Sequence, residues 1–308
     1  MRVLVVVNDQ AGLSDAGLYQ FVRLLGLQCC EVTLRYVAPD SEIPSLVADA
    51  TLFERIVVAA GDGTVSAVAY ATRGTGVPIL TYPSGTANLL AMNLGLPMEP
   101  PALADLLMRG PHAAIDLGEL TAADIDGTPV TSGFALIAGA GYDAAIMRGA
   151  ASLKPALGVA AYFVSAAGNL APTPATFAVT VDGEELQTEG IAVLITNFGR
   201  IQFDLTLTPG ADPQDGLLDV AILRGKTPVG LLPALTAAML LDRSGEHLDR
   251  SNAIEVRCGA RIEVASEPLL AMQADGDVLR SSTPFTARVL PRAATLVVPA
   301  ETGLATQP

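Results

Sequence analysis

A short glycine loop follows one of the most apolar runs in the chain, and its residue types suit the binding of a phosphate group. The run Ile56–Ala60 leads directly into Gly61-Asp62-Gly63-Thr64 and then into a segment with helical spacing. Where a buried strand ends and a helix begins, several backbone N–H groups lack intrahelical partners and can bind an anion. We expect both glycines to permit positive φ and to let a phosphate approach the backbone. Asp62 would face a cation or a hydroxyl, although Asp-Gly is also an ordinary turn pair.

A second loop of the same kind follows the next apolar run along the chain. The run Ile79–Tyr82 leads into Ser84-Gly85-Thr86, after which a helix is predicted from about Ala87 to Gly95. Neighbouring parallel strands present their carboxyl ends at one edge of a sheet, so the two loops can face one crevice. Asn88 would lie on the first turn of that helix, either as a site residue or as a local cap.

The elements that must position these loops are short apolar runs alternating with helical spacing, which predict a parallel sheet with crossover helices. A first helix is expected to begin at an N-cap, Ser14, and to end at Gly26, and a second helix is expected over Val65–Ala71. The predicted strands are Val3–Val7, Val32–Tyr36, Ile56–Ala60 and Ile79–Tyr82.

Beyond about Ile115 the pattern changes, which predicts a mainly antiparallel second domain. Four Asp-Gly pairs separate short apolar or alternating runs, as hairpin turns do. These pairs are Asp126-Gly127, Asp182-Gly183, Asp215-Gly216 and Asp275-Gly276. Two stretches with helical spacing, Leu153–Leu170 and Pro228–Leu241, interrupt the pattern. A last strand is expected over Ala294–Pro299, and the tail Glu301–Pro308 is expected to have no regular structure.

Composition and charge exclude several classes of protein. Of the 308 residues 50% are hydrophobic and 16% are charged, so the chain can bury two domains and does not belong among disordered proteins. A formal net charge of -14 repels nucleic acid phosphates, and we therefore expect no nucleic acid partner.

The cysteines and the apolar segments bear on location. The chain has three cysteines, Cys29, Cys30 and Cys258, whose number and spacing do not indicate a set of disulfide bonds. This favours a reducing compartment. The first apolar run is too short for a signal peptide, and no apolar stretch reaches the roughly 20 residues of a membrane-spanning helix. We therefore expect a cytoplasmic protein, with membrane contact limited to peripheral contact at the inner face.

The two glycine loops and several downstream segments together resemble the diacylglycerol kinase catalytic-domain family, which includes bacterial soluble lipid kinases and the sphingosine kinases. The matching segments are GDGT at 61–64, PSGTAN at 83–88, LGLP at 94–97, SLKPALGVAAYF at 152–163, PGADPQDGLLDV at 209–220 and ADGD at 274–277. The resemblance implies an α/β ATP-binding domain over 1–118, to which the segment 287–308 returns, and a β-sandwich-like domain over 119–286. It also implies nucleotide contacts from Asn8, Gly61, Asp62, Gly63, Thr64, Gly85, Thr86 and Asn88.

The resemblance further implies a magnesium site. The segment 212–217 is similar to the site of bacterial members, in which the Asp215 carboxylate would act together with the backbone oxygens of Asp212 and Leu217. One carboxylate with carbonyls and waters suits Mg²⁺, which prefers oxygen ligands and keeps part of its hydration shell. The plain alternative is a β-turn.

A general base is implied near the C-terminus. Asp275-Gly276-Asp277 falls where the family has Asp-Gly-Glu, whose glutamate is a candidate base in bacterial members. Asp275 and Asp277 would point to one face if that segment is extended, which makes Asp277 the expected base with Asp275 beside it. Two alternatives stand: the pair is one more hairpin turn, or Asp62 is the base, as in sphingosine kinase relatives.

Several positions depart from the family's pattern. The loop at 8–12 keeps Asn8 and Gly12 but lacks the usual proline, and Ala60 replaces a glycine before Asp62. Ser66-Ala67 stands where the family has Asn-Glu, Leu89 stands where it often has aspartate, and the segment 197–204 lacks a common glycine run. These changes remove polar groups from the expected site.

The sequence therefore predicts an ATP- and Mg²⁺-dependent kinase that phosphorylates a lipid hydroxyl, diacylglycerol-like or sphingoid-like. One alternative is an NAD kinase-like enzyme, which shares the glycine-aspartate-glycine-threonine loop. The other is a degenerate lipid-binding regulatory protein, suggested by Ser66, Ala67 and Leu89. The identity of the lipid and the oligomeric state, with a homodimer among the options, stay open.

Overall fold

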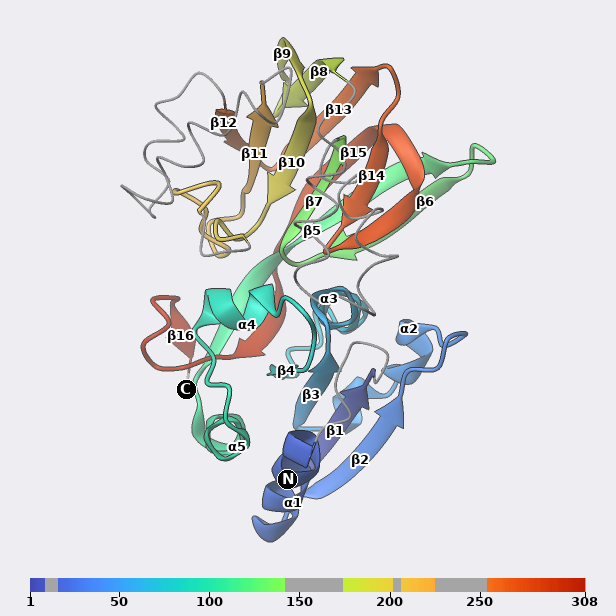
Figure 1. The fold of residues 1–308 in the computed structure, drawn as a ribbon. Helices are drawn as coiled ribbons and strands as arrows, with labels where there is room; N and C mark the ends of the chain where they lie inside the picture. Colours follow the sequence, from blue (N-terminus) through green and yellow to red (C-terminus); the bar gives the residue numbers. More distant parts are fainter. Residues whose placement is uncertain (9–15, 142–173, 202–205, 225–253, 308) are drawn as a thin grey trace. The chain divides into compact units, whose positions relative to one another are not determined.

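The computed structural model describes residues 1–8, 16–141, 174–201, 206–224 and 254–307, and the chain forms two compact units (Figure 1). Unit 1 contains Met1–Leu117 together with Pro291–Pro308, and unit 2 contains Gly118–Leu290. Strands β5 (His112–Asp124) and β15 (Asp277–Val297) each contribute residues to both units. The chain therefore passes from one unit to the other within continuous strands.

Unit 1 is built on a parallel sheet, which confirms the predicted α/β class. Its strands run in the order β15–β4–β3–β1–β2, and each neighbouring pair is parallel. The strands are β1 (Arg2–Val7), β2 (Glu31–Tyr36), β3 (Arg55–Ala60) and β4 (Ile79–Pro83). The helices are α1 (Ala16–Leu27), α2 (Ile43–Leu46), the 3-10 turn η2 (Ala50–Leu52), α3 (Asp62–Ala71), α4 (Leu89–Leu94) and α5 (Pro100–Arg109).

The central strands of this sheet are buried on both faces, which explains their continuous apolar runs. From the centre of the sheet the chain steps outward in opposite directions, from β1 to β2 and from β3 to β4. Because such crossovers are right-handed, α1 and α3 lie on opposite faces. Phe21 of α1 contacts Tyr82 of β4, with 5.3 Å between the ring centroids. The strand order thus reverses between β1 and β3, where open α/β sheets bind ligands.

Three details of unit 1 differ from the sequence-based expectations. Helix α1 continues through Gly26, and the residue in the left-handed region is Cys29, at φ 61°. The N–H of Cys29 donates to the Gly26 carbonyl and that of Cys30 to the Leu25 carbonyl, so the helix ends in a Schellman arrangement. Helix α5 was not predicted. The tail is not wholly irregular, because β16 (Thr306–Gln307) pairs with the start of β5.

Unit 2 is antiparallel, and the predicted β-sandwich class is confirmed. One run of strands follows the order β12–β11–β10–β7–β14–β15, and β15 also pairs with β13, which leads through β8 to β9. The remaining strands are β6 (Pro129–Phe134), β7 (Ile137–Gly141), β8 (Ala175–Val181), β9 (Glu184–Gly190), β10 (Ala192–Thr196), β11 (Leu218–Leu223), β12 (Ile254–Gly259), β13 (Arg261–Glu267) and β14 (Ala271–Ala274).

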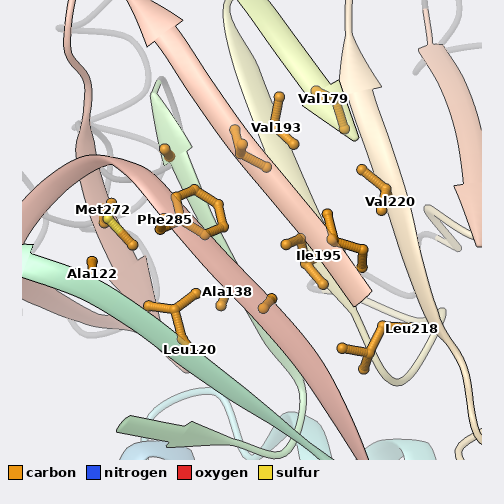
Figure 2. Close-up of a cluster of buried hydrophobic side chains, with 14 of the residues drawn as sticks. Leu120, Ala122, Ala138, Val179, Val193, Ile195, Leu218, Val220, Met272 and Phe285 are labelled. Atoms are coloured by element: carbon orange, nitrogen blue, oxygen red, sulfur yellow. The ribbon is translucent and has the colours of Figure 1, made fainter. Parts of the chain in front are cut away.

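The inner faces of these strands share one apolar core (Figure 2). Val179 and Phe285 come from the β8–β13–β15 side, and Val193, Ile195 and Val220 come from β10 and β11. All five side chains are buried. This packing on alternate residues is what a sandwich of antiparallel sheets requires.

Two of the predicted Asp-Gly hairpin turns are two-residue turns with positive φ at both positions. These are Asp182-Gly183, between β8 and β9, and Asp275-Gly276, between β14 and β15. The predicted helical stretches Leu153–Leu170 and Pro228–Leu241 lie outside the described residues, as does Ser14. In the described part of the chain, no helix combines the length and the apolar character needed to cross a bilayer.

Candidate functional site

The predicted nucleotide loops of unit 1 lie at the carboxyl edge of the sheet, after β1, β3 and β4. Asn8 directly follows β1, and its backbone N–H donates to the Ala59 carbonyl at 3.0 Å. Its side-chain Nδ2 donates to Thr64 Oγ1 at 3.0 Å. Asn8 therefore joins the end of β1 to the first turn of α3. The rest of the loop after β1, including Asp9 and Gly12, lies outside the described residues.

The two glycine loops touch through their backbones. A Cβ placed on Gly85 would lie 2.6 Å from the Cα of Gly61 and 3.3 Å from its nitrogen. Because ordinary contacts between carbon atoms are about 3.5–4.0 Å, no side chain fits at this position. Position 85 therefore requires glycine because the backbone of Gly61 approaches it closely, and not because its own backbone angles are unusual.

The expectation that Gly61 and Gly63 use positive φ is wrong. Gly61 is the N-cap of α3 at φ −78°, and Gly63 lies within the first turn of that helix. The residue with positive φ in this region is Asn88, at φ 50°. Asparagine adopts that conformation more readily than most residues because its short polar side chain can hydrogen-bond locally.

Asn88 closes the second loop on itself. Its Oδ1 accepts the N–H of Gly85 at 2.8 Å, and its Nδ2 donates to the carbonyl of Gly85 at 2.9 Å. Both polar atoms of this side chain therefore hold the loop, whereas the helix-cap role weighed for Asn88 from the sequence is not observed, because its side chain makes no cap hydrogen bond to α4.

Asp62 joins the first loop to the helix that follows the second. Its Oδ2 accepts the N–H of Leu89 and its Oδ1 accepts the N–H of Leu90, both at 3.0 Å. These N–H groups belong to the first turn of α4, where no intrahelical acceptor exists. Asp62 thus supplies the cap of a helix that begins 27 residues later.

Four backbone N–H groups in the two loops remain available to a ligand. Within the residues that the structure describes, the N–H groups of Gly63, Thr64, Thr86 and Ala87 donate to no carbonyl and no side chain. Two of them lie on the first turn of α3, where the helix dipole favours negative charge. Converging unpaired N–H groups at a helix start bind phosphate well.

The segment predicted to hold magnesium forms a turn in unit 2. Asp212 Oδ1 accepts the N–H of Gln214 at 3.0 Å, and Asp215 Oδ1 accepts the N–H of Leu217 at 2.8 Å. Both aspartates are exposed, and Gly216 has φ 78°. Among the described residues, no group of three or more histidine, cysteine or acidic side chains is arranged to hold a metal.

Asp219, two residues after Leu217, was missed by the sequence interpretation. It lies on β11, and burial, with the charge of Asp215 as the second cause, raises the pKa of its carboxyl to about 6. The sequence feature that could have identified Asp219 is the presence of an acidic residue within the apolar run at 217–223. Asp116, another acidic residue in an apolar run, is fully buried and accepts the N–H of Arg292 at 2.7 Å.

The two predicted base residues near the C-terminus do not share a face. Asp275 has φ 46° and is the first residue of a two-residue turn, so the segment is not extended there. Its Oδ1 accepts the N–H groups of Leu136 and Ile137, and its Oδ2 accepts that of Ala135, at 2.8–3.0 Å. Asp275 is buried and holds the turn, whereas Asp277 is exposed as the first residue of β15.

Family comparisons cover almost all of the chain. The model of the diacylglycerol kinase catalytic domain matches residues 2–120. The model of the YegS C-terminal NAD kinase beta sandwich-like domain matches residues 137–298.

Individual relatives agree with these matches. A probable lipid kinase YegS-like protein of Pseudomonas fluorescens is 31% identical over 84% of this chain and 82% of its own length. An uncharacterized protein of Synechocystis is 28% identical over 80% of this chain, which spans only 55% of that relative. A diacylglycerol kinase structure from Bacillus anthracis has a TM-score of 0.75 at 20% identity, with 97% of each chain covered. A yeast NADH kinase structure has a TM-score of 0.56 at 12% identity, covering 98% of this chain and 84% of its own.

Proposed function

The chain belongs to the lipid kinase family of the diacylglycerol kinase catalytic domain, and we propose that it transfers the γ-phosphate of ATP to a lipid hydroxyl. The observation that carries this proposal is the pair of glycine loops whose backbones touch at Gly61 and Gly85. The loops leave N–H groups unpaired at the carboxyl edge of a parallel sheet, beside the point where the strand order reverses and where such folds bind ligands.

In this proposal, the phosphates of ATP are held by backbone donors. The N–H groups of Gly63 and Thr64 come from the start of α3, and those of Thr86 and Ala87 come from the second loop. Asn8 holds the Thr64 hydroxyl in place, and Asn88 holds the second loop closed. A preorganised set of donors stabilises the charge on a transferring phosphoryl group without reorganisation during the reaction.

A magnesium ion is proposed at the turn of Asp212–Leu217, as the family resemblance implies. The Asp215 carboxylate and the carbonyl oxygens of Asp212 and Leu217 would hold it, a donor set of the hard oxygens that Mg²⁺ prefers. The turn fits this role because a carboxylate oxygen that accepts one N–H keeps further lone pairs for a cation. The ion would supply positive charge that orders the turn.

The proposed general base is Asp277, which stands at the position of the family's glutamate. Asp277 is an exposed residue at the start of β15. Asp275 is proposed to fix the turn that carries Asp277, because its own carboxylate accepts three backbone N–H groups. A positioned carboxylate takes the proton as the hydroxyl attacks phosphorus.

An NAD kinase-like activity is the second candidate within enzymes. The observation that favours it is the fold similarity to the yeast NADH kinase, which at 12% identity extends to the fold alone. The third candidate, a degenerate lipid-binding protein, is motivated by the polar residues that this chain lacks at Ser66, Ala67 and Leu89.

One assay separates the three candidates. The protein is incubated with radiolabelled ATP and Mg²⁺, and with either a panel of diacylglycerols, monoacylglycerols and sphingoid bases or with NAD, and the products are identified by mass. Transfer of label to a lipid supports the proposal and identifies the substrate class. Label on NAD alone would replace it with the second candidate, and lipid binding without transfer would favour the third.

A further inference from the structure

The carboxylate of Asp62 is committed to the backbone of another helix. Its two oxygens accept from two consecutive N–H groups, those of Leu89 and Leu90, each at 3.0 Å. Aspartate in a glycine-aspartate-glycine loop was one of the candidates for the general base. A base needs a lone pair directed at the substrate hydroxyl, and here each carboxylate oxygen already directs one lone pair at an N–H group of α4.

Among the residues that the structure describes, no side chain other than that of Asp62 caps the start of helix α4. Its N-cap residue, Asn88, is in the left-handed region and makes no side-chain cap hydrogen bond to the helix. Instead, Asn88 uses both polar atoms on Gly85. Leu89, which stands where the family often has an aspartate, has no polar group to offer. The first turn of α4 therefore depends on Asp62 for its acceptors.

The same contact sets the spacing of the phosphate loops. Asp62 lies one residue after Gly61, and Gly61 touches the backbone of Gly85. A displacement of α4 away from Asp62 would carry Thr86 and Ala87 away from the first turn of α3. The unpaired N–H groups of the two loops would then no longer converge on one anion.

We infer that Asp62 is a positioning residue, which holds α4 and the second glycine loop against the first glycine loop, and that it is not the general base. This inference rests on the proposed function for its kinetic consequences only. The positioning role itself predicts a change in ATP binding, which is measured without any lipid.

The test compares Asp62→Asn with a matched control, Asp182→Asn. The asparagine side chain keeps one acceptor but presents an NH₂ group to a backbone N–H. The control removes a similar arrangement in unit 2, where Asp182 accepts the N–H groups of Ala260 and Arg261. Direct titration with ATP and thermal unfolding without nucleotide are measured first, followed by kcat, KM for ATP and the pH profile of kcat.

If Asp62 is a positioning residue, Asp62→Asn weakens ATP binding and raises KM for ATP roughly ten- to hundredfold, as expected for the loss of a charge-assisted hydrogen bond. We expect kcat at saturating ATP to stay within about threefold of wild type, with the acidic limb of its pH profile retained. The control is destabilised but binds ATP normally. Asp62→Glu, which keeps the charge and both acceptor oxygens, recovers part of the affinity and is used if the asparagine variant does not fold.

The opposite pattern, in which Asp62→Asn keeps its ATP affinity and loses kcat, would overturn the inference. If Asp62→Asn binds ATP as wild type does but loses kcat by roughly 10²–10⁴-fold, Asp62 is the base. Unchanged ATP affinity and unchanged melting temperature would also overturn it. If the wild type phosphorylates no lipid, the proposed function fails, while the titration with ATP still tests whether Asp62 positions the two loops.

Discussion

Replacing Gly85 by alanine tests the contact on which the nucleotide cradle depends. The new Cβ would lie 2.6 Å from the Cα of Gly61, and the usual separation of such atoms is about 3.5–4.0 Å, so the loops must move apart by roughly 1 Å. The obstacle is backbone, which cannot rotate away as a side chain does. Overpacking of this kind costs about 1–3 kcal/mol. For a unit of this size, that corresponds to a fall in melting temperature of about 3–10 °C.

The assay is thermal unfolding together with titration of ATP, which should bind at least tenfold more weakly because the donors of the two loops separate. Gly26→Ala is the matched control, since a Cβ at Gly26 meets no atom within 4 Å and the residue lies within α1. Alanine is the better helix former, so this control should melt at or slightly above the wild-type temperature. If Gly85→Ala melts with wild type and binds ATP equally well, the close contact and the cradle built on it are wrong.

Four further substitutions address unit 2. Asp215→Ala should weaken Mg²⁺ binding and lower activity together, and a magnesium-induced thermal shift identical to that of wild type would refute the metal assignment. Asp277→Asn should lower kcat by roughly 10²–10⁴-fold with ATP affinity unchanged, and near-normal turnover in this variant would refute its assignment as the base. Asp275→Asn should mainly lower the melting temperature, because it replaces one of the two oxygens that accept three backbone N–H groups by an NH₂ group. The pKa of Asp219 is raised to about 6 in the folded protein, above the value of about 4 expected when unfolded, so its charge destabilises the fold increasingly from about pH 4 to pH 6. Asp219→Asn should therefore melt higher than wild type at pH 7.5 and equally at pH 4; the same difference at both pH values would contradict this reasoning.

The sequence predicted the sheet of unit 1 because its strands carry their own signal. Runs such as Val3–Val7 are buried on both faces, and the glycine loops follow the strands directly, so their meeting at one edge follows from parallel order. The end of α1 was missed because Cys29, a residue without a cap preference, adopts the left-handed conformation. Helix α5 was missed because its first turn carries two prolines, Pro100 and Pro101, which were not read as a helix start.

Side-chain roles within the site were less predictable than the positions of the loops. The bond from Leu89 to Asp62 joins residues 27 apart in the chain, and no local pattern requires it. Asp275 and Asp277 fit an extended segment by spacing alone, but the Asp-Gly turn signal at the same place was the correct one. The turn preference of Asp-Gly therefore predicted this segment correctly. The expectation that Asp275 and Asp277 point to one face failed because it assumed an extended strand.

Two of the places where this chain departs from its family, Ala60 and Ser66, bear on whether it is a degenerate member, and their burial argues against that alternative. Ala60, which replaces a glycine, ends β3 in regular pairing with Pro83 of β4 and is buried, so it needs no unusual backbone and leaves the Gly61–Gly85 contact intact. Ser66 is also buried, within α3 and beyond the first-turn residues Gly63 and Thr64 whose N–H groups remain unpaired. A polar residue lost at such a position removes none of the proposed phosphate donors, because these are backbone N–H groups. These two substitutions therefore alter packing, while the backbone groups proposed to hold ATP are retained.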